Sequence, residues 1–114
     1  INSLKIIINK KYKSLISISK IDKKYHYLKQ IEFFENNIKL SNKGGKKIFA
    51  RQQLNQTFMR NGVIYIFERD KLYKYKNLIS NNSFGYVVED EIVNIDSKKD
   101  VILARELYEK LEKK

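Results

Sequence analysis

The spacing of apolar residues at the start of the chain predicts a helix followed by a buried strand. Ile1, Leu4 and Ile8 recur at helical spacing, so residues 1–10 are interpreted as the end of an amphipathic helix. The run "SLISIS" at 14–19 is short, rich in β-branched residues and bounded by lysines, which is typical of a buried strand.

Residues 22–50 interrupt this regular pattern. Their short alternating runs are separated by Asn-Asn and Gly-Gly, which indicates hairpin-like strands and an exposed loop. Alternation in "YHYL" predicts a strand at residues 25–28. The continuous apolar run "NGVIYIF" at 61–67 predicts a strand covered on both faces, with its Asn-Gly as a turn into the strand.

The last part of the chain adds a helix at 69–79, a short strand at 84–89 and a final helix from Ser97 onward. Ser97 is a plausible N-cap with Asp100 three residues on. The final helix carries apolar residues at intervals of three and four, namely Val101, Ala104, Tyr108 and Leu111. We expect a single α/β domain over residues 1–114, with an inserted β-rich segment.

Composition limits the classes of site that are available. The chain has 114 residues, of which 42% are hydrophobic and 14 are aromatic, so it can form a folded core. It has no cysteine, which excludes disulfides, a thiol nucleophile and Cys-based metal sites. The chain has no run of about 18 apolar residues, so no membrane-spanning helix is expected. We expect a cytoplasmic protein.

Charge gives two open interpretations. The formal net charge is +11, and residues 1–50 hold twelve lysines against three acidic residues, a balance of +9. Such a surface attracts phosphate, nucleic acid or an anionic small molecule. The lysines are scattered and form no Arg-rich run or RNA-binding signature, so a solvated surface is favoured and nucleic acid is not the expected partner.

The acidic residues concentrate in one window. Five of the thirteen fall within "EDEIVNIDSKKD" at 89–100. Asp96 ends an apolar run that is interpreted as a strand, just before a helix start, and carboxyl ends of strands are where α/β sheets bind ligands. Asp96 is therefore a candidate Mg²⁺ ligand. The alternative is that Asp96 caps or precedes the helix and favours its dipole.

Three other features have weaker functional interpretations. His26 is the single histidine and lacks a partner nucleophile, so a packed or half-exposed side chain is expected. Gly44 and Gly45 lack the strand-loop-helix setting of a phosphate loop, so a flexible loop is expected. Arg51 and Gln52 precede the apolar run in a polar stretch, and the planar fork of an arginine matches a carboxylate or phosphate.

Two segments together resemble acylneuraminate cytidylyltransferases, also called CMP-sialic acid synthetases. "ARQQLNQTFMRNGVIYIFERDKL" is similar to the family's Arg-Arg-Gln-Asp, spacer and Asn-Gly-Ala-Ile-Tyr-Ile. "VNIDSKKDVILARELYEK" resembles its Ile-Asp-Ile-Asp, Asp and terminal helix, and "KSLISIS" its upstream strand. The resemblance implies the C-terminal half of a nucleotidyltransferase-type, Rossmann-like mixed sheet.

The resemblance also implies a reaction and roles for residues. These enzymes join CTP to an acidic nine-carbon sugar with the help of Mg²⁺, giving a CMP-sugar for lipopolysaccharide or capsule synthesis and pyrophosphate. Arg51 would pair with the sugar carboxylate and Gln52 would line its pocket, while Asn61 would shape the approach to the strand. The remaining implied site residues are Asp96 and Asn94 at the metal, and Phe84 and Tyr86 near the acyl or glycerol end.

The resemblance further implies what lies around the site. Residues 22–50 stand where the family has an insert that reaches a second subunit, so a homodimer is expected. Nothing similar to the family's N-terminal nucleotide-binding half precedes Ile1, so the isolated chain is expected to be inactive. Asn94 replaces the first acidic residue of the second motif. Legionaminate, pseudaminate and octulosonate transferases are the related options. An inactive remnant and a basic nucleic-acid-binding module are the alternatives outside this activity.

Overall fold

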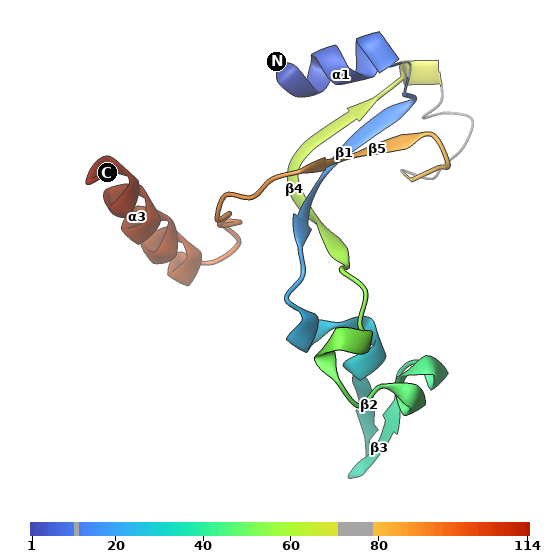
Figure 1. Ribbon diagram of the computed structural model, residues 1–114. Helices are drawn as coiled ribbons and strands as arrows, with labels where there is room; N and C mark the ends of the chain where they lie inside the picture. The colour runs from blue at the N-terminus through green and yellow to red at the C-terminus, as the bar shows by residue number, and fades with distance from the viewer. Residues whose placement is uncertain (11, 71–78) are drawn as a thin grey trace.

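The chain has an extended shape with a small sheet near its middle. The computed structural model describes residues 1–10, 12–70 and 79–114. A separate module hangs below the sheet and one helix lies near each end of the chain (Figure 1). The radius of gyration is 18.3 Å, whereas a compact domain of this length has about 13 Å. Much of the chain is therefore surface.

Three strands form a mixed sheet. β1 (Ser14–Lys20) lies in the middle, with β4 (Phe58–Phe67) antiparallel on one side and β5 (Ser83–Val87) parallel on the other. The first four residues of β1 are buried, as expected for a central strand. The predicted strands at 14–19 and 84–89 are confirmed, and the fold is mixed α/β.

β4 is less covered than its sequence predicts. Within the described part of the chain it pairs with β1 alone, which makes it an edge strand. Val63 is 49% exposed and Tyr65 is 42% exposed. The prediction that 61–67 is covered on both faces is wrong, because an apolar run reports a preference for burial and not the presence of a second layer.

A two-stranded hairpin forms the far end of the insert, the name used here for residues 22–50. β2 (Ile31–Phe34) pairs antiparallel with β3 (Asn37–Leu40). The two residues between the strands, Glu35 and Asn36, have φ values of 47° and 66°. Positive φ at both positions is the pattern of a two-residue type I′ turn, so the predicted hairpin is confirmed.

Short 3₁₀ turns build the rest of this module. They are η1 (Lys23–Tyr25), η2 (Tyr27–Lys29), η3 (Lys43–Lys47) and η4 (Arg51–Gln53). The predicted strand at 25–28 is wrong, because capping bonds from side chains bend the chain there. The Asp22 carboxylate accepts the Lys24 N–H at 3.0 Å and begins η1.

Packing inside the insert depends on His26 and a glycine. His26 is 1% exposed, and its Nδ1 accepts the Leu28 N–H at 3.1 Å, which begins η2. The expectation of a packed or half-exposed histidine is confirmed, with the side chain packed. Gly44 and Gly45 belong to η3 and not to an unstructured loop, and a Cβ on Gly45 would overlap the Leu28 carbonyl oxygen. Glycine at 45 thus lets η3 approach η2 closely.

Both helices form at their predicted positions, but their apolar side chains are not buried against another layer. α1 (Asn2–Lys10) and α3 (Lys98–Glu112) both form. Leu4 on α1 is 50% exposed and Leu111 on α3 is 61% exposed, so the apolar sides face outward. Among the described helices, none is both long and apolar enough to cross a membrane. The predicted helix at 69–79 lies, from 71 to 78, outside the described residues.

The buried apolar core is small. Over the described residues it consists of Leu15 at 0%, Leu54 at 3% and Ile16 at 4% exposure. Two of these side chains belong to β1 of the β1–β4 pair, whereas Leu54 is the C-cap residue of η4. The β1–β4 pair also carries the cleft described next.

Candidate functional site

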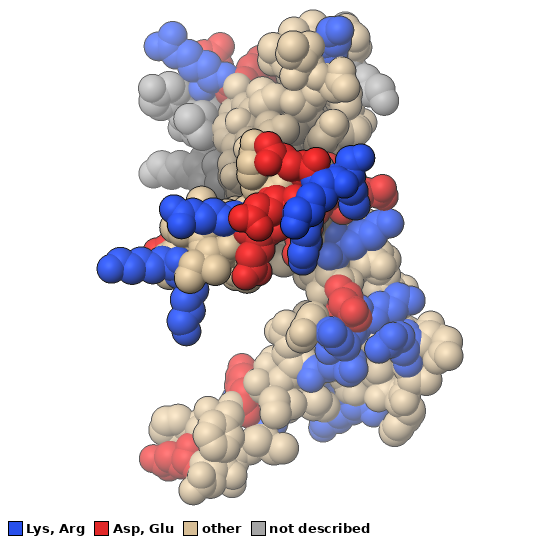
Figure 2. Space-filling model, turned by 90° about the vertical axis from the view of Figure 1, so that its left-hand side faces the viewer, with Lys and Arg blue, Asp and Glu red and all other residues tan. Residues whose placement is uncertain are grey.

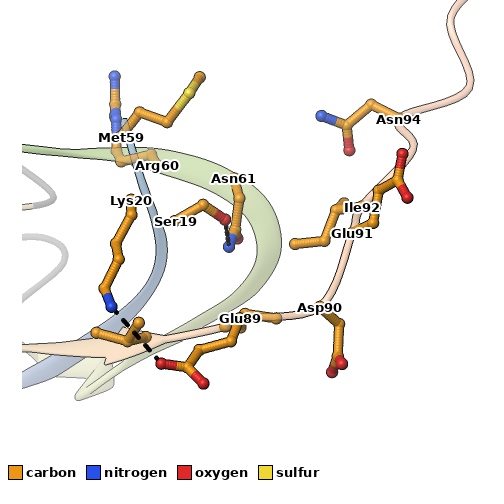
Figure 3. A pocket seen from close by; sticks show the side chains of 12 residues that line it. Ser19, Lys20, Met59, Arg60, Asn61, Glu89, Asp90, Glu91, Ile92 and Asn94 are labelled. Carbon is orange, nitrogen blue, oxygen red and sulfur yellow. Dashed lines mark hydrogen bonds and ion pairs between the residues drawn. The ribbon is translucent and has the colours of Figure 1, made fainter. Parts of the chain in front are cut away.

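An open cleft of about 550 Å³ lies where three segments meet. The ends of β1 and β4 form one wall, and the segment 87–94 that follows β5 forms the other (Figure 3). The lining residues are Ser19, Lys20, Met59, Arg60 and Asn61 on the first wall and Val87, Val88, Glu89, Asp90, Glu91, Ile92 and Asn94 on the second.

Asn61 holds the base of the cleft together. Its side chain is 7% exposed. Its Oδ1 accepts the Ser17 hydroxyl at 2.5 Å and the Val63 N–H at 3.2 Å, and its Nδ2 donates to the Ser19 hydroxyl at 2.9 Å. Both ends of the amide are therefore engaged, and the side chain joins β4 to β1.

Asn61 and Gly62 form a β-bulge and not a turn. Ile16 pairs with Tyr65 and Ile18 pairs with Arg60, so residues 61–64 of β4 stand opposite Ser17 alone. The Ser17 hydroxyl accepts the Ile64 N–H at 2.8 Å, which replaces a lost ladder bond. The predicted turn is therefore wrong, because hydrogen bonds from these side chains let one strand continue through the Asn-Gly pair.

Gly62 supplies the backbone conformation that the bulge needs. Its φ is +76°, in the left-handed region where residues with a Cβ are strained. The Asn94 Oδ1 lies 3.9 Å from the position that a Cβ on Gly62 would take. The Asn-Gly pair and Asn94, which are about thirty residues apart in sequence, thus lie beside each other in the cleft.

The two walls carry opposite charge. Lys20 and Arg60 lie on the strand wall, while the acidic run from Glu89 to Glu91 lies on the other wall. Lys20 and Glu89 form an ion pair at 3.7 Å across one side of the cleft, with side chains 59% and 80% exposed (Figure 3). A pair this exposed contributes little stability.

Arg51 and Gln52 lie outside the cleft. Both are exposed in η4, which is held against the insert by Gln53: its Oε1 accepts the Phe49 N–H at 2.7 Å, and its Nε2 donates to the Lys47 carbonyl at 3.1 Å. The structure therefore presents Arg51 on the insert and does not bring it to Asn94.

The charged groups near Arg51 also belong to the insert. The pKa of the Asp22 carboxyl lies below its ordinary value, first because the Lys24 backbone N–H donates to it. The positive charges of Lys24, Arg51 and Lys29 lower this pKa further. Arg51 thus belongs to a group of cations around Asp22.

Asp96 precedes α3 and does not end a strand. The segment 91–95 has no regular structure, so the predicted position of Asp96 at a strand end is wrong. Its backbone N–H donates to Asp100 Oδ2 at 3.0 Å, as part of a capping box in which the Ser97 hydroxyl also donates to that oxygen at 2.8 Å. β5 ends at Val87, well before Asp96, so Asp96 lies beside the cap of α3 and not at the end of a strand.

The hydrogen bonds of this cap lower the pKa of the Asp100 carboxyl. Its pKa is lowered first by the hydrogen bond from the Ser97 hydroxyl and then by the backbone N–H groups of Asp96 and Ser97. The predicted N-cap at Ser97 is confirmed. The charge of Asp100 is stabilised by donors at the N-terminus of α3.

The donors available for Mg²⁺ form an incomplete set. Across the described residues, no three His, Cys, Asp or Glu side chains gather closely enough to hold a metal ion. Asp96 and Asn94 are exposed and two residues apart, and they offer one carboxylate and one amide oxygen. This set fits Mg²⁺ that also binds substrate phosphates, because such ions take one or two protein carboxylates.

Phe84 and Tyr86 lie on β5, opposite Leu15 and Ser17 of β1. Both are half-buried, and the Phe84 ring packs against Tyr12 with ring centroids 5.0 Å apart. Of the residues predicted for the site, Asn61 and Asn94 are brought together in the cleft, and the two aromatic residues are not among its lining residues.

Sequence reasoning missed the charged lining of the cleft. Lys20 and Arg60 were not predicted as site residues, although Arg60 directly precedes the Asn-Gly pair. Two signals could have identified them: serines at 17 and 19 within an apolar strand, and an Asn-Gly inside a strand-forming run. Such a pair marks a bulge as readily as a turn.

Comparison with known proteins adds no assignment. No protein-family model matches the chain, and a search of curated proteins gave no match. The function must therefore be argued from the residues of the cleft and from the resemblance of the two motifs.

Proposed function

We propose that this chain forms the sugar-binding part of a cytidylyltransferase for an acidic nine-carbon sugar. One observation carries the proposal: the two segments that resemble the family meet in one cleft. Asn61 and Gly62 come from the first segment, and Asn94 comes from the second. A chance likeness between two separate surface segments gives no reason for them to share a cavity.

The proposed fold is part of a larger nucleotidyltransferase-type, Rossmann-like sheet. The exposed apolar faces of β4, α1 and α3 support this proposal, since a complete layer would cover them. The radius of gyration of 18.3 Å also exceeds the value of about 13 Å for a compact domain. The nucleotide-binding part would cover these faces and supply the CTP pocket.

The proposed reaction is nucleotidyl transfer. The anomeric hydroxyl oxygen of the sugar bonds to the α-phosphorus of CTP, the bond to the β-phosphate oxygen breaks, and pyrophosphate leaves with the hydroxyl proton released to water. Mg²⁺, when bound, would neutralise phosphate charge, with Asp96 and Asn94 as its protein ligands. This chain's own contribution is to bind and orient the sugar.

The resemblance assigns Arg51 and Gln52 to the sugar, yet η4 lies on the insert. A second copy of the chain would resolve this difference by bringing its η4 to the cleft of the first. The insert offers a self-complementary surface for such a homodimer. One face of the hairpin is entirely apolar, and it consists of Ile31, Phe33, Ile38 and Leu40.

The proposed function is tested by sugar binding. The chain is titrated with sialic, legionaminic and 3-deoxy-octulosonic acids and with glucose, followed by saturation-transfer NMR. We expect the nine-carbon acids to bind and glucose not to bind. Absence of binding by every acidic sugar would overturn the proposal. With CTP, Mg²⁺ and sugar, residues 1–114 alone are expected to release no pyrophosphate, because the proposed role of these residues is to bind and orient the sugar.

A second candidate function is binding of single-stranded nucleic acid by the insert. Its three 3₁₀ turns, η1 to η3, and η4 directly after it each have a basic residue in the last turn, and basic side chains gather over one part of the module (Figure 2). This candidate predicts that log K for an oligonucleotide falls steeply with log salt, with a slope of about −0.7 per phosphate contact. A flat salt dependence would exclude it.

A further inference from the structure

The cleft contains one cation that no neighbouring carboxylate neutralises. Lys20 is paired with Glu89 at 3.7 Å. Arg60 lines the same cleft and forms no ion pair with any residue that the structure describes. Its guanidinium is therefore available to a ligand, in the cavity where the two motif segments meet.

The backbone at Arg60 is fixed. Arg60 pairs with Ile18 of β1 and directly precedes the bulge, where the Asn61 side chain hydrogen-bonds to the Ser17 and Ser19 hydroxyls of β1 and so joins the two strands. A ligand group that reaches Arg60 therefore meets a side chain whose Cα is already held in place, so little backbone entropy is lost on binding.

The opposite wall restricts the kind of ligand that fits. Glu89, Asp90 and Glu91 line that wall together with Asn94. Carboxylates accept hydrogen bonds from hydroxyl groups, and the amide of Asn94 can either accept or donate one. The carboxylates repel a simple anion. A neutral sugar would leave Arg60 without a partner. A polyhydroxylated molecule with one carboxylate satisfies both walls.

We propose that Arg60 binds the carboxylate of the acidic sugar in this cleft, while the hydroxyl groups face the acidic wall. This inference rests on the proposed function and adds a specificity residue to it. The planar fork of arginine donates two parallel hydrogen bonds to a carboxylate. Arg51, which the motif pattern favours, is not a lining residue of the cleft in its own chain.

The test compares sialic acid with its methyl ester, which keeps the hydroxyl groups and loses the charge. Dissociation constants are measured by calorimetry at low salt for the wild-type chain, for Arg60→Gln and for Arg51→Gln. The matched control is Arg105→Gln, at an exposed position of α3 that does not line the cleft. The acid should bind the wild type about 10–100-fold more tightly than the ester, the range expected for a charge-assisted hydrogen bond. Arg60→Gln should remove this preference. An unchanged far-UV circular dichroism spectrum checks that the variant folds.

Each outcome is decisive. A preference that survives Arg60→Gln overturns the inference, as does a preference lost only in Arg51→Gln. Loss in both variants supports a carboxylate held by two arginines, of which Arg60 is one. If the wild type binds acid and ester equally, the sugar site stands and the role of Arg60 fails. If it binds neither, the proposed function itself fails.

Discussion

Replacement of Asn61 by alanine should destabilise the fold more than any other single change at the cleft. The substitution removes three hydrogen bonds: those that Asn61 accepts from the Ser17 hydroxyl and the Val63 N–H, and the one that it donates to the Ser19 hydroxyl. Ser17 keeps its bond from the Ile64 N–H, and the other two partners can reach water. At about 1 kcal/mol for each neutral hydrogen bond, the expected loss is about 2–3 kcal/mol.

Urea unfolding followed by circular dichroism measures this loss. With a slope of about 1–3 kcal/mol per molar for a small protein, the midpoint should fall by about 1–2 M. Asn55→Ala is the matched control, because Asn55 is exposed and its loss should change stability by less than about 0.5 kcal/mol. Equal midpoints for Asn61→Ala and Asn55→Ala would refute the role of the Asn61 network.

Three further predictions concern the bulge, the cap and the hairpin. Gly62→Ala should lower stability by about 1–2 kcal/mol in the same assay because φ is +76°, and Gly62→Asn, which tolerates the left-handed region, should lose less; equal losses would contradict this. Since the pKa of Asp100 is lowered by folding, its stabilisation of α3 is complete above about pH 4 and is lost as pH falls through the folded pKa. Helicity at 222 nm should therefore decrease in acid, and Asp100→Asn should show a smaller acid-dependent change; identical pH profiles would exclude the cap as the cause. In sedimentation velocity, Phe33→Ser should abolish the proposed homodimer, whereas Phe34→Ser on the opposite face of the hairpin should leave it intact. A dimer that survives Phe33→Ser would count against the hairpin interface.

The sequence predicted elements whose stability is local. The strand at 14–19 has β-branched residues and polar ends, and the final helix has a Ser97 cap with Asp100 three residues on. Both form as predicted because their information is contained within a few residues. The hairpin at the far end of the insert follows for the same reason, since its short alternating strands meet at a polar two-residue turn.

The wrong predictions involve partners that are distant in sequence. In the sequence, the Asn-Gly pair has the pattern of a turn. In the structure, Ser17 and Ser19, more than forty residues earlier, form hydrogen bonds with Asn61 and keep the pair within a strand. "YHYL" alternates like a strand, but the His26 side chain accepts a backbone N–H and begins a 3₁₀ turn instead. Of the residues predicted for the site, Asn61 and Asn94 both line the cleft, whereas Arg51 is in η4 beside the insert. The roles of these residues stay predictions.

The bulge also sets the direction in which the insert points. β1 and β4 run past the bulge as a paired ladder, and the Ile21 N–H still donates to the Thr57 carbonyl at 2.9 Å where the chain leaves the sheet. The hairpin is therefore at the end of an arm that continues the β1–β4 ladder beyond Asn61-Gly62 (Figure 1). A bulge bends its strand and increases the local twist, so the geometry at Asn61-Gly62 sets the direction in which this arm leaves the sheet. A strand without the bulge would point the hairpin tip elsewhere and change the angle at which two copies could meet.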